Sequence, residues 1–174
     1  MYNKVNDMNK IGKFARSTGQ ERNFAGMAQE KSMTRREARV AIVSTLFSYE
    51  YTPEKTAEQL NDERVGVLGG REDAYIAEAV AGVLANLSEI DGLIERSAVG
   101  WALGRISRVS RAILRLACFE MLYRPEIPTL VSLDEAVELA KSYDDENAYS
   151  FVNGVLNRAM QSEEVRRARA EDKG

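Results

Sequence analysis

Residues 75–94 read YIAEAVAGVLANLSEIDGLI, and their large apolar side chains recur with a helical period. The intervals are four, three, four, three and four residues, at Ile76, Val80, Val83, Leu87, Ile90 and Ile94. Side chains three and four positions apart lie on one face of an α-helix. This stretch therefore predicts one long helix that buries a single apolar face against other helices.

A central, buried helix is predicted at residues 107–123. From Ala112 onward this segment is apolar on almost every side, which is typical of a helix surrounded by others. Pro125 and Pro128 follow it, and they are expected to end it because proline cannot continue a helix. Cys118 lies within the apolar run, so burial as a small apolar side chain is favoured over a reactive role.

The helical region is predicted to begin at Thr34-Arg35-Arg36-Glu37. A threonine followed three residues later by glutamate forms a capping box, in which each side chain satisfies a free backbone N–H group of the other. The helix is expected to run to about Tyr51. Thr52 and Pro53 predict the start of a second helix, as its cap and first helical residue, and this helix should end near Asn61.

Two further helices are predicted toward the C-terminus. Ser132-Leu133-Asp134-Glu135 reads as a second capping box that starts a helix through Lys141, with Val131 packing back against Ala136. Gly154 lies inside the last helix, where it costs about 1 kcal/mol relative to alanine and so indicates close approach of a neighbouring helix. The apolar face of that helix comprises Phe151, Val152, Val155, Leu156 and Ala159. No stretch alternates as a strand does, and the predicted fold class is all-α.

The distribution of apolar and charged residues divides the chain into three parts. Residues 1–32 hold few large apolar side chains and are predicted to form a flexible arm. Residues 33–161 form the predicted helical domain, and residues 162–174 a charged tail, solvated or frayed. The chain lacks both the apolar run of roughly 20 residues that crosses a bilayer and the apolar core of a secretory signal. We therefore expect a cytoplasmic protein without membrane association.

The residue types that are missing exclude several classes of site. The chain has no histidine and one cysteine, which excludes Ser-His-Asp and Cys-His catalysis, histidine-bearing zinc sites and an internal disulfide. Nothing in the spacing of the carboxylates or lysines indicates catalysis. No enzyme activity, metal or cofactor is therefore expected.

The formal net charge of −3 conceals a strong asymmetry. Residues 1–33 carry six basic and three acidic side chains, or +3, so the remainder carries −6. Within that remainder arginines concentrate in two places, Arg35, Arg36 and Arg39 and then Arg105, Arg108, Arg111 and Arg115. We expect the last three to pair mainly with acidic side chains of a neighbouring helix. Such a chain is suited to bind RNA at one surface and a basic protein at another.

The first helix contains the residue types of an RNA site. At 100° per residue, Arg35, Arg36 and Arg39 border its apolar stripe, and Phe47 projects away from the centre of that stripe. Guanidinium groups bind phosphates, and a flat aromatic ring stacks on an unpaired base. Two alternatives stay open at this point. Phe47 packs against the second helix, or the arginines form a solvated face paired with glutamates.

Four segments in order resemble the NusB family of transcription antitermination factors. They are TRREARVAIVSTLFSYEY (34–51), YIAEAVAGVLANLSEIDGLI (75–94), SRAILRLACFEML (110–122) and VSLDEAVELAKSYDDENAYSFVNGVLNRA (131–159). The resemblance implies about seven helices in two packed helical subdomains. It also implies binding of boxA-type single-stranded RNA in ribosomal RNA leader transcripts, together with the ribosomal protein NusE. The pair would act on the RNA polymerase elongation complex with other Nus factors.

The resemblance also bears on individual residues. It implies that the loop at residues 124–128 lies near the RNA, which makes Arg124 and Glu126 candidate contacts. The family's first helix often has another basic residue where Glu37 stands and a tyrosine where Phe47 stands. Asn157 replaces a common aspartate, and the first 33 residues have no recognised counterpart.

Carboxylates on the outer side of the helix at residues 75–94 are candidates for a partner surface. Glu78 and Glu89 are expected to face a basic protein such as NusE, because acidic surfaces steer the association of basic partners. Two other functions stay open. One is an RNA-binding accessory module related to ribosomal-RNA cytosine methyltransferases, and the other is a helical protein-interaction adaptor without RNA affinity.

Overall fold

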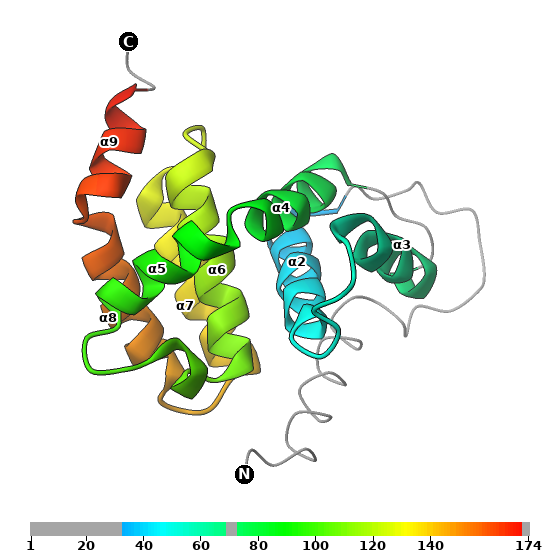
Figure 1. Ribbon diagram of the computed structural model, residues 1–174, viewed down its shortest axis with the longest axis horizontal. Helices are drawn as coiled ribbons and strands as arrows, with labels where there is room; N and C mark the ends of the chain where they lie inside the picture. Colours follow the sequence, from blue (N-terminus) through cyan, green and yellow to red (C-terminus); the bar gives the residue numbers. More distant parts are fainter. Residues whose placement is uncertain (1–32, 69–72, 172–174) are drawn as a thin grey trace. The chain divides into compact units, whose positions relative to one another are not determined.

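The computed structural model describes residues 33–68 and 73–171, and all regular secondary structure in those ranges is helical (Figure 1). The all-α prediction is confirmed. The chain divides into two compact units, one extending to Val80 and the other starting at Ala81. The described residues hold eight α-helices, against about seven expected. The proposed arm, residues 1–32, lies outside the described residues.

The first helix of the first unit, α2, spans Arg35–Tyr49 and begins at the predicted capping box. The Glu37 amide donates to Thr34 Oγ1 at 3.2 Å, and the Thr34 amide donates to Glu37 Oε2 at 2.8 Å. Most of the circumference of α2 is buried: Ala38, Arg39, Val40, Ala41, Ile42, Val43, Thr45, Leu46 and Phe47. The apolar face is therefore wider than the single predicted stripe.

Helix α3, Ala57–Leu68, begins and ends later than predicted. Thr52 and Pro53 lie in the connection before it. The true start is a second capping box, in which the Gln59 amide donates to Thr56 Oγ1 at 3.2 Å and the Thr56 amide donates to Gln59 Oε1 at 2.9 Å. Two reciprocal hydrogen bonds fix the helix start better than a proline alone.

The long helix predicted at residues 75–94 is two helices, α4 (Ala74–Ala85) and α5 (Leu87–Ser97). Asn86 separates them with φ −113° and ψ 21°. Its Nδ2 donates to the Gly82 carbonyl at 2.8 Å. Asparagine side chains compete in this way with the backbone hydrogen bonds of a helix. The apolar stripe is nevertheless buried on both sides of the break, at Ile76, Val80, Val83, Ile90 and Ile94.

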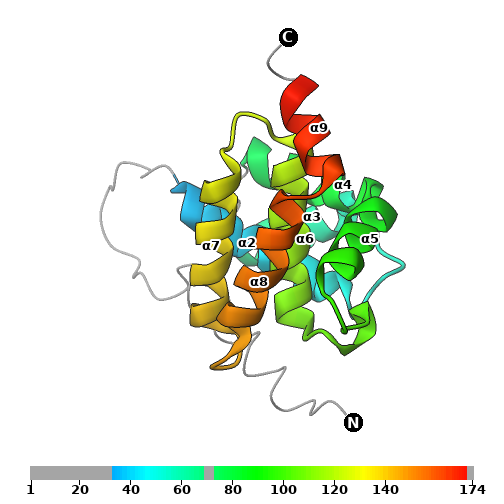
Figure 2. The ribbon, with the colours of Figure 1, turned by 90° about the vertical axis from the view of Figure 1, so that its left-hand side faces the viewer.

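Helix α6, Arg108–Tyr123, is the centre of the second unit, as predicted. It packs against α5, α7 (Thr129–Tyr143), α8 (Ala148–Met160) and α9 (Glu163–Glu171), and Figure 2 shows it between α5 and α7. Arg115 donates from Nε and Nη2 to the two carboxylate oxygens of Asp91 on α5, both at 2.8 Å. The expected pairing of Arg115 is confirmed. Cys118 is fully buried, and this burial raises its pKa to about 12.

Helix α7 begins at Thr129, three residues before the predicted capping box at Ser132. Ser132 lies inside the helix, where its hydroxyl donates to Glu120 Oε2 at 2.6 Å in the interior. The buried carboxylate of Glu120 on α6 thus accepts a hydrogen bond from the Ser132 hydroxyl, which was expected to cap α7. Val131 is 42% exposed instead of packing back on the helix.

Two expectations about the last part of the chain are wrong. A Cβ at Gly154 would meet nothing within 4 Å, whereas one at Gly82 would collide with the Phe119 ring. The close helix approach is therefore at Gly82. The tail is not frayed at Glu163–Glu171, because these residues form helix α9.

Helix α9 is held by Arg169, which caps the carboxyl end of α6. Its guanidinium donates to the carbonyl oxygens of Glu120, Met121, Arg124 and Pro125, at 2.8, 2.9, 3.2 and 2.9 Å. The last carbonyls of a helix have no partner within it, and a cation there also interacts favourably with the helix dipole.

In the ranges 33–68 and 73–171, no helix is long and apolar enough to cross a membrane.

Candidate nucleic-acid interface

The arginines predicted to bind RNA differ in exposure. Arg35 and Arg36 in the first turn of α2 are exposed, whereas Arg39 is only 6% exposed. The guanidinium of Arg35 lies 4.7 Å from the centre of the Tyr75 ring. A stacked guanidinium keeps its charge and its outward donors. Arg35 and Arg36 are therefore the two cations of this cluster that reach solvent.

Phe47 does not present its ring to solvent. It is 1% exposed, and its ring meets that of Tyr51 edge-on with centroids 5.5 Å apart. A base cannot stack on a ring in this position, so the packing alternative describes Phe47 here. Tyr51 is 43% exposed, so it is an accessible aromatic side chain at this end of the helix.

The predicted loop contacts, Arg124 and Glu126, pair with each other. Arg124 Nε donates to Glu126 Oε1 at 2.6 Å. Slight burial acts to raise the pKa of Glu126, but the hydrogen bond and charge of Arg124 outweigh it and lower that pKa. Arg169 binds the carbonyl groups of Arg124 and Pro125 and so fixes the backbone of the loop.

A cluster that the sequence reasoning did not identify lies at Trp101, Arg105 and Phe151 in the second unit. The Trp101 ring is 48% exposed, and it meets the Phe151 ring edge-on at 5.5 Å. Arg105, at the end of the 3₁₀ turn η1 (Leu103–Arg105), holds its guanidinium 5.7 Å from the centre of the Trp101 ring. Gly100, with φ +82°, makes the turn that precedes Trp101.

This cluster has the chemistry of a single-strand RNA site. An exposed indole offers a surface on which any base can stack, and a guanidinium beside it can reach the phosphate. The sequence signal was a tryptophan between two glycines, Gly100 and Gly104. Its partner Phe151 lies fifty residues away in the chain, so only the fold shows that the two rings meet.

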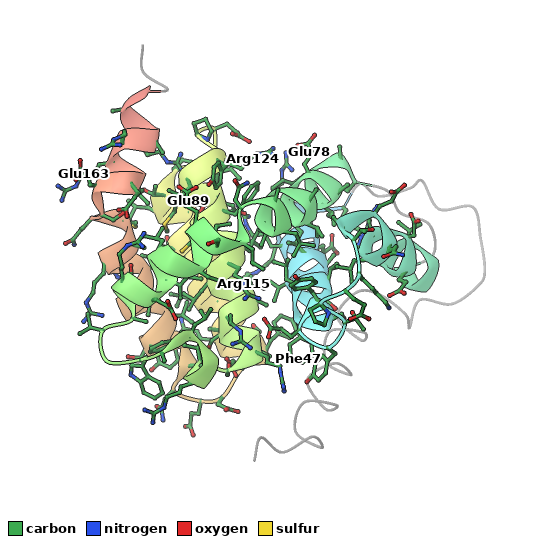
Figure 3. All side chains as sticks on the ribbon, viewed as in Figure 1. Phe47, Glu78, Glu89, Arg115, Arg124 and Glu163 are labelled. Carbon is green, nitrogen blue, oxygen red and sulfur yellow. The ribbon has the colours of Figure 1, made fainter. Side chains whose placement is uncertain are left out.

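The two carboxylates predicted to face a partner belong to different units. Glu78 is exposed on α4, in the part of the chain up to Val80. Glu89 is exposed on α5 and accepts a hydrogen bond from the Tyr123 hydroxyl at 2.6 Å. Burial, together with the hydrogen bond to Glu89, raises the pKa of Tyr123 well above its ordinary value. Figure 3 labels both glutamates.

The described residues show no sign of a metal site or a reactive thiol. In 33–68 and 73–171, no three side chains of the His, Cys, Asp and Glu types gather closely enough to hold a metal ion. The thiol of Cys118 is buried, with its pKa at about 12, and so carries no thiolate at neutral pH. The site is therefore one of charges and aromatic rings.

Comparison with known proteins gives one consistent family. A sequence profile described as NusB family matches residues 36–161. The transcription antitermination protein NusB of Acetivibrio thermocellus is 42% identical over 129 residues, which cover 74% of this chain and 89% of that protein. The NusB of Bacillus licheniformis is 41% identical over 126 residues, covering 72% and 95%.

Two solved structures are similar in fold. NusB of T. maritima superposes with a TM-score of 0.69 at 37% identity, covering 79% of this chain and 98% of that chain. A chain in the crystal structure of a plectonemic RNA supercoil superposes with a TM-score of 0.66 at 28% identity, covering 73% and 94%.

Proposed function

Because the chain belongs to the NusB family of transcription antitermination proteins, which are not enzymes, we propose that it binds boxA-type single-stranded RNA of ribosomal RNA leader transcripts. It does so together with the ribosomal protein NusE, in the cytoplasm. The pair then acts on the RNA polymerase elongation complex with other Nus factors.

The observation that carries RNA binding is the Trp101 ring, half exposed, with Phe151 against its edge and Arg105 near its face. An exposed indole beside a second ring and a guanidinium is suited to a ligand that has both flat faces and negative charge. Unpaired bases have such faces, and the adjacent guanidinium matches their phosphates. Arg35 and Arg36 on α2 add two further exposed cations.

The structure of a similar chain in a crystal with RNA supports the same ligand class.

The proposal of a protein partner rests on charge. The chain outside residues 1–33 carries −6, and Glu78 and Glu89 are exposed. A basic ribosomal protein would be steered toward such surfaces, with an association rate that falls as salt is added.

The test is a fluorescence anisotropy titration of a labelled boxA-like RNA with the full chain, with and without NusE. We expect the RNA to bind this chain more tightly than a scrambled RNA of equal length, and NusE to increase that affinity. Binding of NusE without any RNA affinity would favour a protein-interaction adaptor. Equal affinity for both RNAs, unchanged by NusE, would contradict the boxA assignment.

A further inference from the structure

A groove of about 520 Å³ lies among α5, α6 and α9 in the second unit, at the end opposite the Trp101 cluster along α6. Its apolar surface comes from Leu122, Pro125 and Ala168, together with the Tyr123 ring. Glu89 of α5 and Glu164 of α9 contribute the carboxylates that line it. The volume lies within the range of small-ligand and side-chain pockets, about 300–1,000 Å³.

The groove is built and held in shape. Arg169 binds four carbonyl oxygens at the end of α6 and so fixes α9 beside it. Val165 on α9 is 2% exposed, which anchors that helix in the core of the unit. The Tyr123 hydroxyl donates to Glu89 Oε2 at 2.6 Å and orients that carboxylate. The lining residues therefore hold their positions without a ligand.

The carboxylate of Glu89 has capacity for a second partner. Its Oε2 receives the Tyr123 hydroxyl, and no side chain of the described ranges donates to its Oε1. Glu164 accepts from Arg96 Nη2 at 2.8 Å, and both side chains of that pair are partly exposed. Its own backbone hydrogen bond and the charge of Arg96 lower the pKa of Glu164, so this carboxylate is charged at neutral pH.

The charge of the lining selects the class of ligand. Arg167, the cation among the lining residues, is paired with Glu163 at 2.9 Å. Glu164 is paired in the same way with Arg96 at 2.8 Å, so the two ion pairs offset each other and the carboxylate of Glu89 leaves the lining negative. A phosphate or a nucleic-acid backbone would meet Glu89 and Glu164 and be repelled. An ammonium or guanidinium group would be attracted by these carboxylates. An apolar side chain next to it in the partner would be removed from water when it packs on the apolar surface of the groove.

We propose that this groove binds a basic segment of a protein partner, in which a lysine or arginine stands beside an apolar residue. The cation lies against Glu89 and Glu164, and the apolar side chain lies on Leu122 and Pro125. Within the second unit this surface lies at the opposite end of α6 from the Trp101 cluster, beside the loop that holds Arg124 and Glu126. The inference rests on the proposed function, which already offers Glu89 to a basic partner, and deepens it by naming the groove and the side chains that this partner presents.

The probe is a pair of short acetylated peptides with one polar frame, Gly-Ser-Leu-Lys-Ser-Gly and Gly-Ser-Ser-Gln-Ser-Gly. Each is titrated into the isotopically labelled full chain, and backbone amide shifts are followed by nuclear magnetic resonance. We expect the Leu-Lys peptide to shift signals of Leu122, Tyr123 and Ala168 saturably. The Ser-Gln peptide should leave them unchanged.

Two groove variants test the chemistry separately. Glu89→Gln with Glu164→Gln keeps the shape and the acceptor for Tyr123 but removes both charges, and should weaken binding about twofold to thirtyfold. Ala168→Leu keeps the charges and fills the groove, and should weaken binding by at least as much. The matched control, Glu63→Gln with Glu138→Gln, removes two exposed carboxylates elsewhere and should bind as the parent does.

Four outcomes would overturn the proposal. They are the absence of saturable shifts, equal binding of both peptides, and groove shifts produced by a short RNA instead. The fourth is groove shifts that grow with protein concentration alone, which would identify a second copy of the chain as the occupant. Loss of boxA RNA binding bears only on the proposed function, because the peptide titration contains no RNA.

Discussion

Phe47 and Trp101 are both aromatic side chains suited to stack on a base, but the fold buries one and exposes the other. Phe47 is 1% exposed on a helix that is buried around most of its circumference, whereas Trp101 is 48% exposed in a turn after α5. The first was expected to stack on RNA, and the second was not. Exposure therefore depends on which neighbouring segments cover a side chain, and it cannot be inferred from residue type alone.

The largest expected effect is on folding, from Phe47→Ala. Removing a fully buried ring leaves a cavity and should lower the free energy of unfolding by about 3–5 kcal/mol. Urea denaturation followed by circular dichroism measures the change. If the free energy of unfolding falls by less than about 1 kcal/mol while RNA affinity falls strongly, Phe47 would be an RNA-binding residue and not a core residue.

Trp101→Ala should lower RNA affinity more than stability, the reverse of Phe47→Ala. We expect RNA affinity to fall by about 1–3 kcal/mol, the range for one stacked base, which corresponds to about fivefold to 150-fold. The free energy of unfolding should fall by less, about 0.5–1.5 kcal/mol for the contact with Phe151.

The matched control is Tyr149→Ala. Tyr149 is 41% exposed, and Lys141 Nζ lies 5.7 Å from the centre of its ring, the same distance as Arg105 from Trp101. Anisotropy titrations of both variants with one labelled RNA compare them directly. If both variants lose equal affinity, any exposed ring would suffice, and the Trp101 cluster would have no special role.

A smaller effect is expected from the cations. Arg35→Ala with Arg36→Ala should flatten the slope of log K against log salt by roughly 1.4, since each phosphate contact to a single strand contributes about 0.7. Arg105→Ala alone should flatten it by roughly 0.7. Titrations at several salt concentrations give the slopes, and unchanged slopes would remove these arginines from the interface.

A separate prediction concerns Cys118, which reports on burial in the core. Its pKa is about 12 in the folded chain and near 9.0 in the unfolded one. The folded state therefore holds its proton more tightly, so this contribution to stability is full below pH 9 and declines as pH rises toward 12. At pH 8 the buried thiol should resist a thiol reagent in the folded chain, and react once the chain is unfolded in urea. Stability of Cys118→Ala should depend less on pH above 9.

Several elements followed from local sequence. The capping box at Thr34 and the central helix, Arg108–Tyr123, were predicted closely, because caps and apolar periodicity act over a few residues. The all-α class followed for the same reason. The family resemblance also came from contiguous motifs, and comparison with known proteins confirmed it.

The errors arose where distant residues decide the outcome. Ser132 looked like a helix cap, but the Glu120 carboxylate on α6 takes its hydroxyl inside α7. The charged tail was predicted to be frayed, but Arg169 donates hydrogen bonds to four carbonyl oxygens at the end of α6. Neither partner adjoins its residue in the chain.

The helical class, the family and the types of chemistry available could all be predicted from the sequence, because they depend on composition and on spacing within single helices. Only the tertiary structure decided which of those side chains meet water. It buried Phe47 and brought Trp101 and Phe151 together from different elements, and it formed the groove beside Glu89. The physical reason is that the exposure of a single ring depends on which segments pack on it, and the residues beside it in the chain do not specify those segments.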